Sequence, residues 1–177
     1  MNLLNSIRQV GSRRIDRLET GEGLLAWLEE LHLIPVETSQ GLRARFSSED
    51  LGAAAAEARG LREWFRAFVH EHKGRPLVEA HLRKLTRLNR LLERDGTYSQ
   101  IVLANENATQ LEIVIQHRWQ SPESLVITLA RALAAFICEE DFSGVKMCAR
   151  AGCTLFFVDR TAGHIRKWCQ CGDRAMH

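Results

Sequence analysis

Four cysteines near the C-terminus carry the clearest chemistry in the sequence. Cys148 and Cys153 form one close pair, and Cys169 and Cys171 form a second pair after fifteen intervening residues. Two close thiol pairs separated by a short loop are typical of structural zinc sites, because each pair grips the metal from a tight turn. The spacing therefore predicts one structural Zn²⁺ held by four thiolates, with no open coordination position for hydrolytic catalysis.

The second pair leaves the fourth ligand open to alternatives. Only Gln170 separates Cys169 from Cys171, so both sulfurs would have to reach one metal, at about 2.3 Å, without the usual turn. His177 or His164 is an alternative fourth ligand. Two other interpretations need no zinc: the thiols could pack in a small core, or Cys169 and Cys171 could form a redox switch.

The rest of the sequence indicates where these cysteines function. No apolar run approaches the roughly 20 residues that a membrane span requires, and the apolar stretch at the start is too short for a signal peptide. We therefore expect a cytoplasmic protein with no membrane partner. In that reducing compartment, clustered cysteines are metal ligands or reactive thiols more often than disulfides. Cys138 stands apart on an apolar segment and is expected to be a core residue.

Basic residues gather beside the cysteines. From Lys146 onward the sequence holds six Lys or Arg against two Asp, a net charge of +4, whereas the remainder of the chain carries −2. Such residues could neutralise nucleic-acid phosphates and gain affinity through counterion release; the alternative is a solvated basic face. The candidate nucleic-acid contacts are Arg160, His164, Arg166, Lys167 and Arg174. Arg174 could instead pair with Asp159 or Asp173 and brace the metal module.

No catalytic constellation is found. His70 and His72 are two positions apart on an expected helix, so they face different sides and cannot grip one ion together; both are expected to be exposed. The sequence contains no Gly-rich phosphate loop. We therefore do not expect an enzyme.

The elements that must position the cysteines are mostly helical. Apolar residues at helical spacing predict helices over 23–33, from about 47 to 74, and over 81–92. Runs of β-branched residues over 98–104 and 111–119 predict a β-hairpin. A further apolar helix is expected from a cap at Ser121 to about Cys138 and would form the central core element. The predicted fold class is therefore α+β, with a mostly α-helical body, residues 1–143, and a small treble-clef-like or ribbon-like zinc finger, residues 144–177.

The C-terminal motif resembles that of the CGNR zinc-finger proteins. Trp168 and Cys169 match the end of the family's Arg-Arg-Trp-Cys, and the segment from Cys171 to Arg174 matches its Cys-Gly-Asn-Arg, with Asp173 in place of asparagine. Residues 155–160 resemble the family's Leu-Phe-x-Asp stretch. In this family the finger follows an ABATE domain, and residues 4–6 are similar to the Asn-Thr segment near the start of that domain.

The resemblance implies a bacterial-type, stress-induced transcription regulator. Its helical body would sense an effector, which the residues do not identify, or form a homodimer, and its zinc finger would bind DNA. A second hypothesis makes the finger a protein-interaction or dimer-stabilising module without a nucleic-acid role. The short second cysteine loop favours this second hypothesis.

Overall fold

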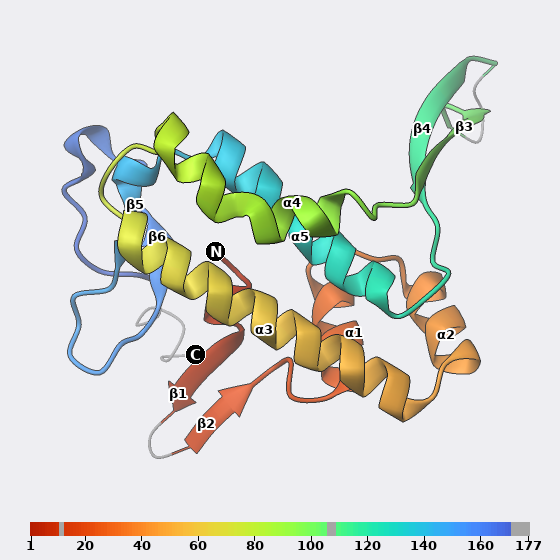
Figure 1. The fold of residues 1–177 in the computed structure, drawn as a ribbon, viewed down its shortest axis with the longest axis horizontal. Coiled ribbons are helices and arrows are strands. Elements are labelled where there is room, and N and C mark those ends of the chain that lie inside the picture. The colour runs from red at the N-terminus through yellow and green to blue at the C-terminus, as the bar shows by residue number, and fades with distance from the viewer. Residues whose placement is uncertain (11–12, 106–108, 171–177) are drawn as a thin grey trace.

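The longest element is helix α3, Ser48–His72, which runs along the body (Figure 1). It begins with a capping box, in which Ser47 accepts a hydrogen bond from the Asp50 amide and the Asp50 carboxylate accepts one from the Ser47 amide.

The computed structural model describes residues 1–10, 13–105 and 109–170. Within these ranges the body is mostly helical and carries β-hairpins, and a small C-terminal region contains another hairpin, which confirms the predicted fold class.

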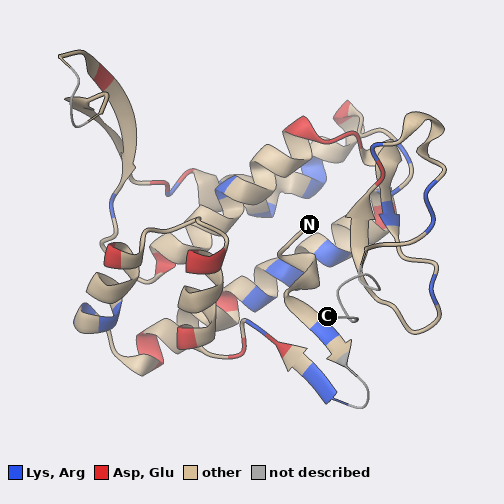
Figure 2. Ribbon diagram, turned by 180° about the vertical axis from the view of Figure 1, so that it is seen from behind, with Lys and Arg blue, Asp and Glu red and all other residues tan. Residues whose placement is uncertain are grey.

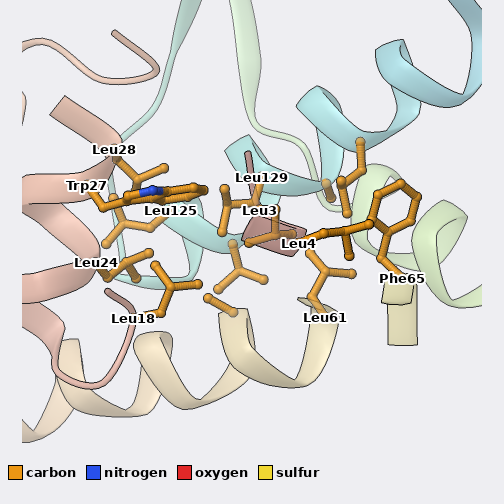
Figure 3. Close-up of a cluster of buried hydrophobic side chains, with 14 of the residues drawn as sticks. Leu3, Leu4, Leu18, Leu24, Trp27, Leu28, Leu61, Phe65, Leu125 and Leu129 are labelled. Atoms are coloured by element: carbon orange, nitrogen blue, oxygen red, sulfur yellow. The ribbon is translucent and has the colours of Figure 1, made fainter. Parts of the chain in front are cut away.

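Helices α1, Gly21–Glu30, and α5, Glu123–Glu139, pack against α3. Together with the N-terminal residues they enclose the core (Figure 3). Its members are large aliphatic and aromatic side chains with almost no exposed surface, among them Leu3, Leu4, Leu18, Leu24, Trp27, Leu28, Leu61, Phe65, Leu125 and Leu129. Burial of these side chains is the main term that stabilises the helical body.

Three separate antiparallel hairpins complete the described structure. Strands β1, Ile7–Val10, and β2, Arg13–Asp16, form the first, and β3, Thr97–Leu103, and β4, Leu111–His117, form the second. The third joins β5, Val145–Met147, to β6, Phe156–Val158, in the C-terminal region. The expected hairpin of residues 98–119 is therefore present, whereas the first hairpin was not predicted.

A buried ion pair ties the first hairpin to α3. Arg62 is 1% exposed, and its guanidinium donates two hydrogen bonds to the Asp16 carboxylate, at 2.6 and 2.7 Å, and one to the Ser6 hydroxyl at 3.0 Å. Burial raises the pKa of Asp16, but the hydrogen bonds from Arg62 and the Leu18 amide lower it more, so the net shift is downward. The pair therefore stays charged and fixes where β2 joins the core.

Several helical boundaries differ from the sequence expectations. The first helix was expected over 23–33 with Pro35 ending it, but α1 already ends at Glu30, and His32 follows with a positive φ of 54°. Pro35 is instead the N-cap of α2, Val36–Arg45, which was not predicted. The stretch expected as one helix over 81–92 consists of a 3₁₀ helix, Glu79–Leu85, followed by α4, Thr86–Leu92. Ser121 is not the cap of α5: Pro122 occupies that position, and no side chain caps this end. None of the described helices is long and apolar enough to cross a bilayer.

Two burial predictions were wrong. Cys138 was expected in the core, but it is exposed, because it lies on the outer side of α5. His72 was expected to be exposed, but it is 6% exposed and packs against Phe68 and His81, with ring centroids 4.6 and 4.3 Å away and the rings tilted. His70 is exposed, as expected.

Candidate metal centre

The first cysteine pair lies on the β5–β6 hairpin. Cys148 follows the last residue of β5, and its amide donates to the Leu155 carbonyl at 2.9 Å. The chain then turns, with the Cys153 amide donating to the Arg150 carbonyl at 3.1 Å and Gly152 at a positive φ of 75°. Glycine adopts this conformation without the steric cost that other residues meet. The tight turn brings the Cys153 sulfur back toward the Cys148 sulfur.

Cys169 approaches the hairpin from the returning chain. The Ala149 amide donates to the Lys167 carbonyl at 2.9 Å, which holds the segment before Cys169 beside the turn. The Cys169 amide then lies 3.4 Å from the Cys148 sulfur. As a result, the sulfurs of Cys148, Cys153 and Cys169 all lie within 4.8 Å of one another.

The sulfur spacing fits a zinc ion. The Cys153 and Cys169 sulfurs are 3.7 Å apart, and two thiolates bound to one tetrahedral zinc at about 2.3 Å would be separated by about 3.8 Å. Burial raises the pKa of the Cys148 thiol, but hydrogen bonds from the Cys169 and Arg150 amides and from the neighbouring thiols lower it more, to about 7. The deprotonated thiolate is the form that binds zinc. These three residues could therefore hold the metal.

The structure does not identify the fourth ligand. Cys171 and the alternative ligand His177 lie outside the described residues. The other alternative, His164, is engaged elsewhere: its Nδ1 lies 2.6 Å from the Asp159 carbonyl and its Nε2 lies 3.2 Å from the Ser143 hydroxyl. Three cysteines thus converge, and the assignment of Cys171 as the fourth ligand stays a prediction.

A buried carboxylate organises the loop that leads to Cys169. Asp159 is 0% exposed and accepts hydrogen bonds from the Thr161 hydroxyl and amide, at 2.6 and 3.0 Å, and from the Arg166 amide at 2.7 Å. The Lys146 ammonium lies 2.9 Å from the same carboxylate. Burial raises the pKa of Asp159, but these hydrogen bonds lower it more, so it lies well below its usual range.

Lys146 also binds the returning chain. Its ammonium donates to the Arg166 carbonyl at 2.9 Å and to the carbonyl of His164. One lysine on β5 and one aspartate just after β6 therefore hold residues 161–166 against the hairpin. This bracing holds the segment that leads to Cys169 against the hairpin.

The C-terminal region is continuous with the body. Val145 and Phe156, from β5 and β6, belong to the same buried cluster as the helical core, and the Gly74 amide after α3 donates to the Phe142 carbonyl at 2.9 Å. Asn5 also contacts β6, because its side chain hydrogen-bonds both backbone groups of Phe156. Asn5 and Asp159 lie in segments that resemble family motifs, but neither these motifs nor the residues around Lys146 indicate the contacts, since the partners are brought together only by the fold.

The predicted nucleic-acid contacts differ in accessibility. Lys167 is exposed, and Arg160 is exposed but forms an ion pair with Glu140. Arg166 is half-buried, with its guanidinium 4.9 Å from the centre of the Phe157 ring, and His164 is held in the network above. Arg174 and Asp173, one of its two alternative partners, lie outside the described residues; the other alternative partner, Asp159, pairs with Lys146.

Two family models match the chain and meet near the start of β5. The ABATE model, described as "Putative stress-induced transcription regulator", matches residues 1–140. The CGNR zinc finger model matches residues 145–176, which include all four predicted cysteine ligands. Neither description names a catalytic activity. No protein with a curated description matches the chain.

Proposed function

The chain belongs to the ABATE family and carries a C-terminal CGNR zinc finger, and on this premise we propose that it is a transcription regulator whose zinc-bound finger contacts DNA phosphates. Zinc, when bound, would cross-link the β5–β6 turn to the returning segment through Cys148, Cys153 and Cys169. The residues of the chain would provide the charge that meets DNA.

A basic groove on the finger carries this proposal. The groove is lined by the β5 strand, the returning segment and the residues just after α3, and four of its lining residues are basic: Lys73, Lys146, Arg166 and Lys167. The Lys146 ammonium is paired with Asp159, so Lys73, Arg166 and Lys167 supply the remaining positive charge. None of the described residues that line it is acidic. Two of the four, Arg166 and Lys167, are among the contacts that the sequence predicts. A concave surface of one charge sign attracts an anionic backbone and raises its local concentration.

A second basic surface lies beside the finger. Arg8, Arg13 and Arg14 are exposed on the β1–β2 hairpin, and Arg8 and Arg14 line a cavity together with Thr154 of the finger. Figure 2 shows Lys and Arg residues on this hairpin and on the loops of the C-terminal region, at the same end of the molecule. The hairpin would therefore extend the phosphate-binding surface beyond the finger.

Salt-dependent binding to a duplex tests the proposal. Binding to a labelled random-sequence duplex should be measured by fluorescence anisotropy at several salt concentrations. The logarithm of the association constant should fall linearly with the logarithm of the salt concentration. The double substitution Arg166→Glu with Lys167→Glu should weaken binding strongly, whereas Arg90→Glu on α4 is a control for charge reversal at an exposed site away from the finger. Arg14→Ala should reduce the salt slope by about 1 if it contacts a phosphate. Absence of binding at low salt, or equal losses in the groove and control variants, would refute the proposal.

A protein-interaction role for the finger is the second candidate. Its specific support is apolar exposure, because Ile165 is 77% exposed, Trp168 is 55% exposed and Met147 is 43% exposed. Three large apolar side chains exposed within the small C-terminal region are a feature that a protein interface could use. The substitution Trp168→Ala should leave DNA affinity unchanged and abolish partner capture if this candidate is correct.

A further inference from the structure

The β3–β4 hairpin, here called the arm, projects from the helices at the end of the molecule opposite the finger (Figure 1). It is a sheet of two strands, and its register pairs Ile101 with Ile113 and Leu103 with Leu111. An isolated two-stranded hairpin is at best marginally stable in water. The arm therefore needs either strong internal pairing or a surface to cover it.

One face of the arm is aliphatic. Directly paired residues of an antiparallel sheet share a face, and alternate residues along each strand lie on that same face. The face that contains the Ile101–Ile113 pair therefore also contains Leu103, Leu111 and Ile115, and these five side chains are 54–72% exposed. The three residue pairs of this face, Ser99–Ile115, Ile101–Ile113 and Leu103–Leu111, contain no charged residue.

The opposite face is more polar. There Gln100 pairs with Val114, Val102 pairs with Glu112, and Tyr98 pairs with Gln116. A strand pattern with one aliphatic and one polar face is that of a sheet with one face covered and one in water. The covering layer for the aliphatic face is not supplied by any described residue of the same chain, because all five aliphatic side chains remain exposed.

We propose that this face is a homodimer interface, in which the arms of two copies of the chain pack face to face about a two-fold axis. The aliphatic surface can meet its own copy without charge repulsion, because it carries no charged residue at its paired positions. Glu112 remains on the outer, solvated face. The arm projects away from the helices, so a second copy would approach it at the edge of the molecule (Figure 1).

The area of the face, if it is buried completely, reaches the lower bound for such a dimer. Five aliphatic side chains at these exposures present on the order of 500 Å² per chain, near the upper end of the apolar patches that monomers carry. Two copies would bury about 1,000 Å², the lower bound for a specific interface.

The base of the arm is fixed to the body, because the Arg131 guanidinium on α5 donates to the Asp95 carboxylate at 2.6 Å.

The dimer can be tested in the absence of DNA. The mass of the full chain should be measured by analytical ultracentrifugation over a micromolar concentration series, and the wild-type chain should form a dimer. The double substitution Ile101→Thr with Ile113→Thr keeps β-branched residues at both positions but makes the face polar. It should raise the dimer Kd by at least about tenfold.

The matched control places the same change on the other face. Val102→Thr with Val114→Thr should leave the dimer intact, and circular dichroism with thermal unfolding should show that both double variants fold. A monomeric wild-type chain, or a dimer that survives the Ile101→Thr and Ile113→Thr changes, would overturn the proposal. The dimer is measured without DNA, so a failure of DNA binding would not affect this result. Added salt also separates the two interactions, because it weakens phosphate contacts but not aliphatic packing.

Discussion

The side chain of Asn5 pairs with the backbone of Phe156 as a neighbouring strand would. Its Nδ2 donates to the Phe156 carbonyl at 2.8 Å, and its Oδ1 accepts from the Phe156 amide at 3.0 Å. Both backbone groups of one β6 residue are thus satisfied by one amide from the start of the chain. The finger is therefore held to the body by polar contacts as well as by the shared core.

Replacing Asn5 should loosen this attachment. Asn5→Ala leaves the amide and carbonyl of Phe156 without their partners, and part-buried unsatisfied groups cost about 1–3 kcal/mol. Urea unfolding followed by tryptophan fluorescence should show a loss of that size. Asn89→Ala, at an exposed position on α4, is the control and should change stability by less than about 0.5 kcal/mol. Equal stability of the two variants would show that the Asn5 hydrogen bonds contribute nothing.

The Asp159 carboxylate should make stability depend on acid pH. A carboxyl whose pKa is lower in the folded than in the unfolded chain stabilises the fold above the unfolded pKa, about 3.9, and this contribution is lost as the pH falls toward the folded pKa. Asp159→Asn should therefore be less stable than the wild type at neutral pH, and the difference should shrink as the pH falls below about 4.

Urea unfolding at a series of pH values measures this convergence. Glu57→Gln removes an exposed carboxylate from α3, and its free energy of unfolding should change with pH in parallel with that of the wild type. A gap between Asp159→Asn and the wild type that stays constant down to the lowest pH at which the chain folds would contradict the assigned role.

The three converging cysteines should each be required for metal. One zinc per chain is expected in protein purified without chelator, and Cys148→Ser, Cys153→Ser and Cys169→Ser should each reduce that content. Cys138→Ser is the internal control, because this thiol is exposed on α5 and does not belong to the cluster. Elemental mass spectrometry gives the ratio directly. A zinc-free wild-type chain would leave only the thiol-packing and redox interpretations.

The fourth ligand can be found with the same measurement. Loss of zinc in Cys171→Ser but not in His177→Ala would assign the site to four cysteines, and the reverse would assign it to three cysteines and one histidine.

A side chain at Gly144 should destabilise the fold. A Cβ at this position would lie 2.6 Å from the Asp159 carbonyl oxygen and 3.0 Å from the His164 ring, so the loop that Asp159 organises would have to shift. Gly144→Ala should destabilise the chain by about 1–3 kcal/mol. Gly52→Ala, in α3 with open space around it, should instead stabilise by about 0.5–1 kcal/mol. Thermal unfolding of both variants should shift Tm in opposite directions, and a neutral Gly144→Ala would contradict the close contact.

Local patterns account for the parts of the fold that the sequence predicts. The Ser47 cap and the apolar residues that follow it define α3, and the β-branched runs define the arm, because each signal lies within one element. The cysteine spacing likewise predicts a common site, since Cys148 and Cys153 are joined by one turn. Helix α2 was missed because Ser39 and Leu42 are its only described buried residues, which leaves almost no apolar periodicity.

Contacts between distant segments could not be predicted in this way. Asn5 and Phe156 are 151 positions apart, and nothing in either neighbourhood indicates the other. The same applies to Asp16 and Arg62, whose pairing fixes an unpredicted hairpin on α3. His72 was misjudged because its burial depends on the packing of His81 from a later segment, not on its place in α3.

The shared core has a consequence for how the chain is made on the ribosome. Phe156 belongs to the same buried cluster as Leu4, yet it is synthesised roughly ten to thirty seconds later at ordinary elongation rates. During that interval the helices can associate while the N-terminal segment still lacks its β6 partner. A nascent chain that stalls before the finger is complete would expose this part of the core, and it would be a substrate for chaperones or proteases.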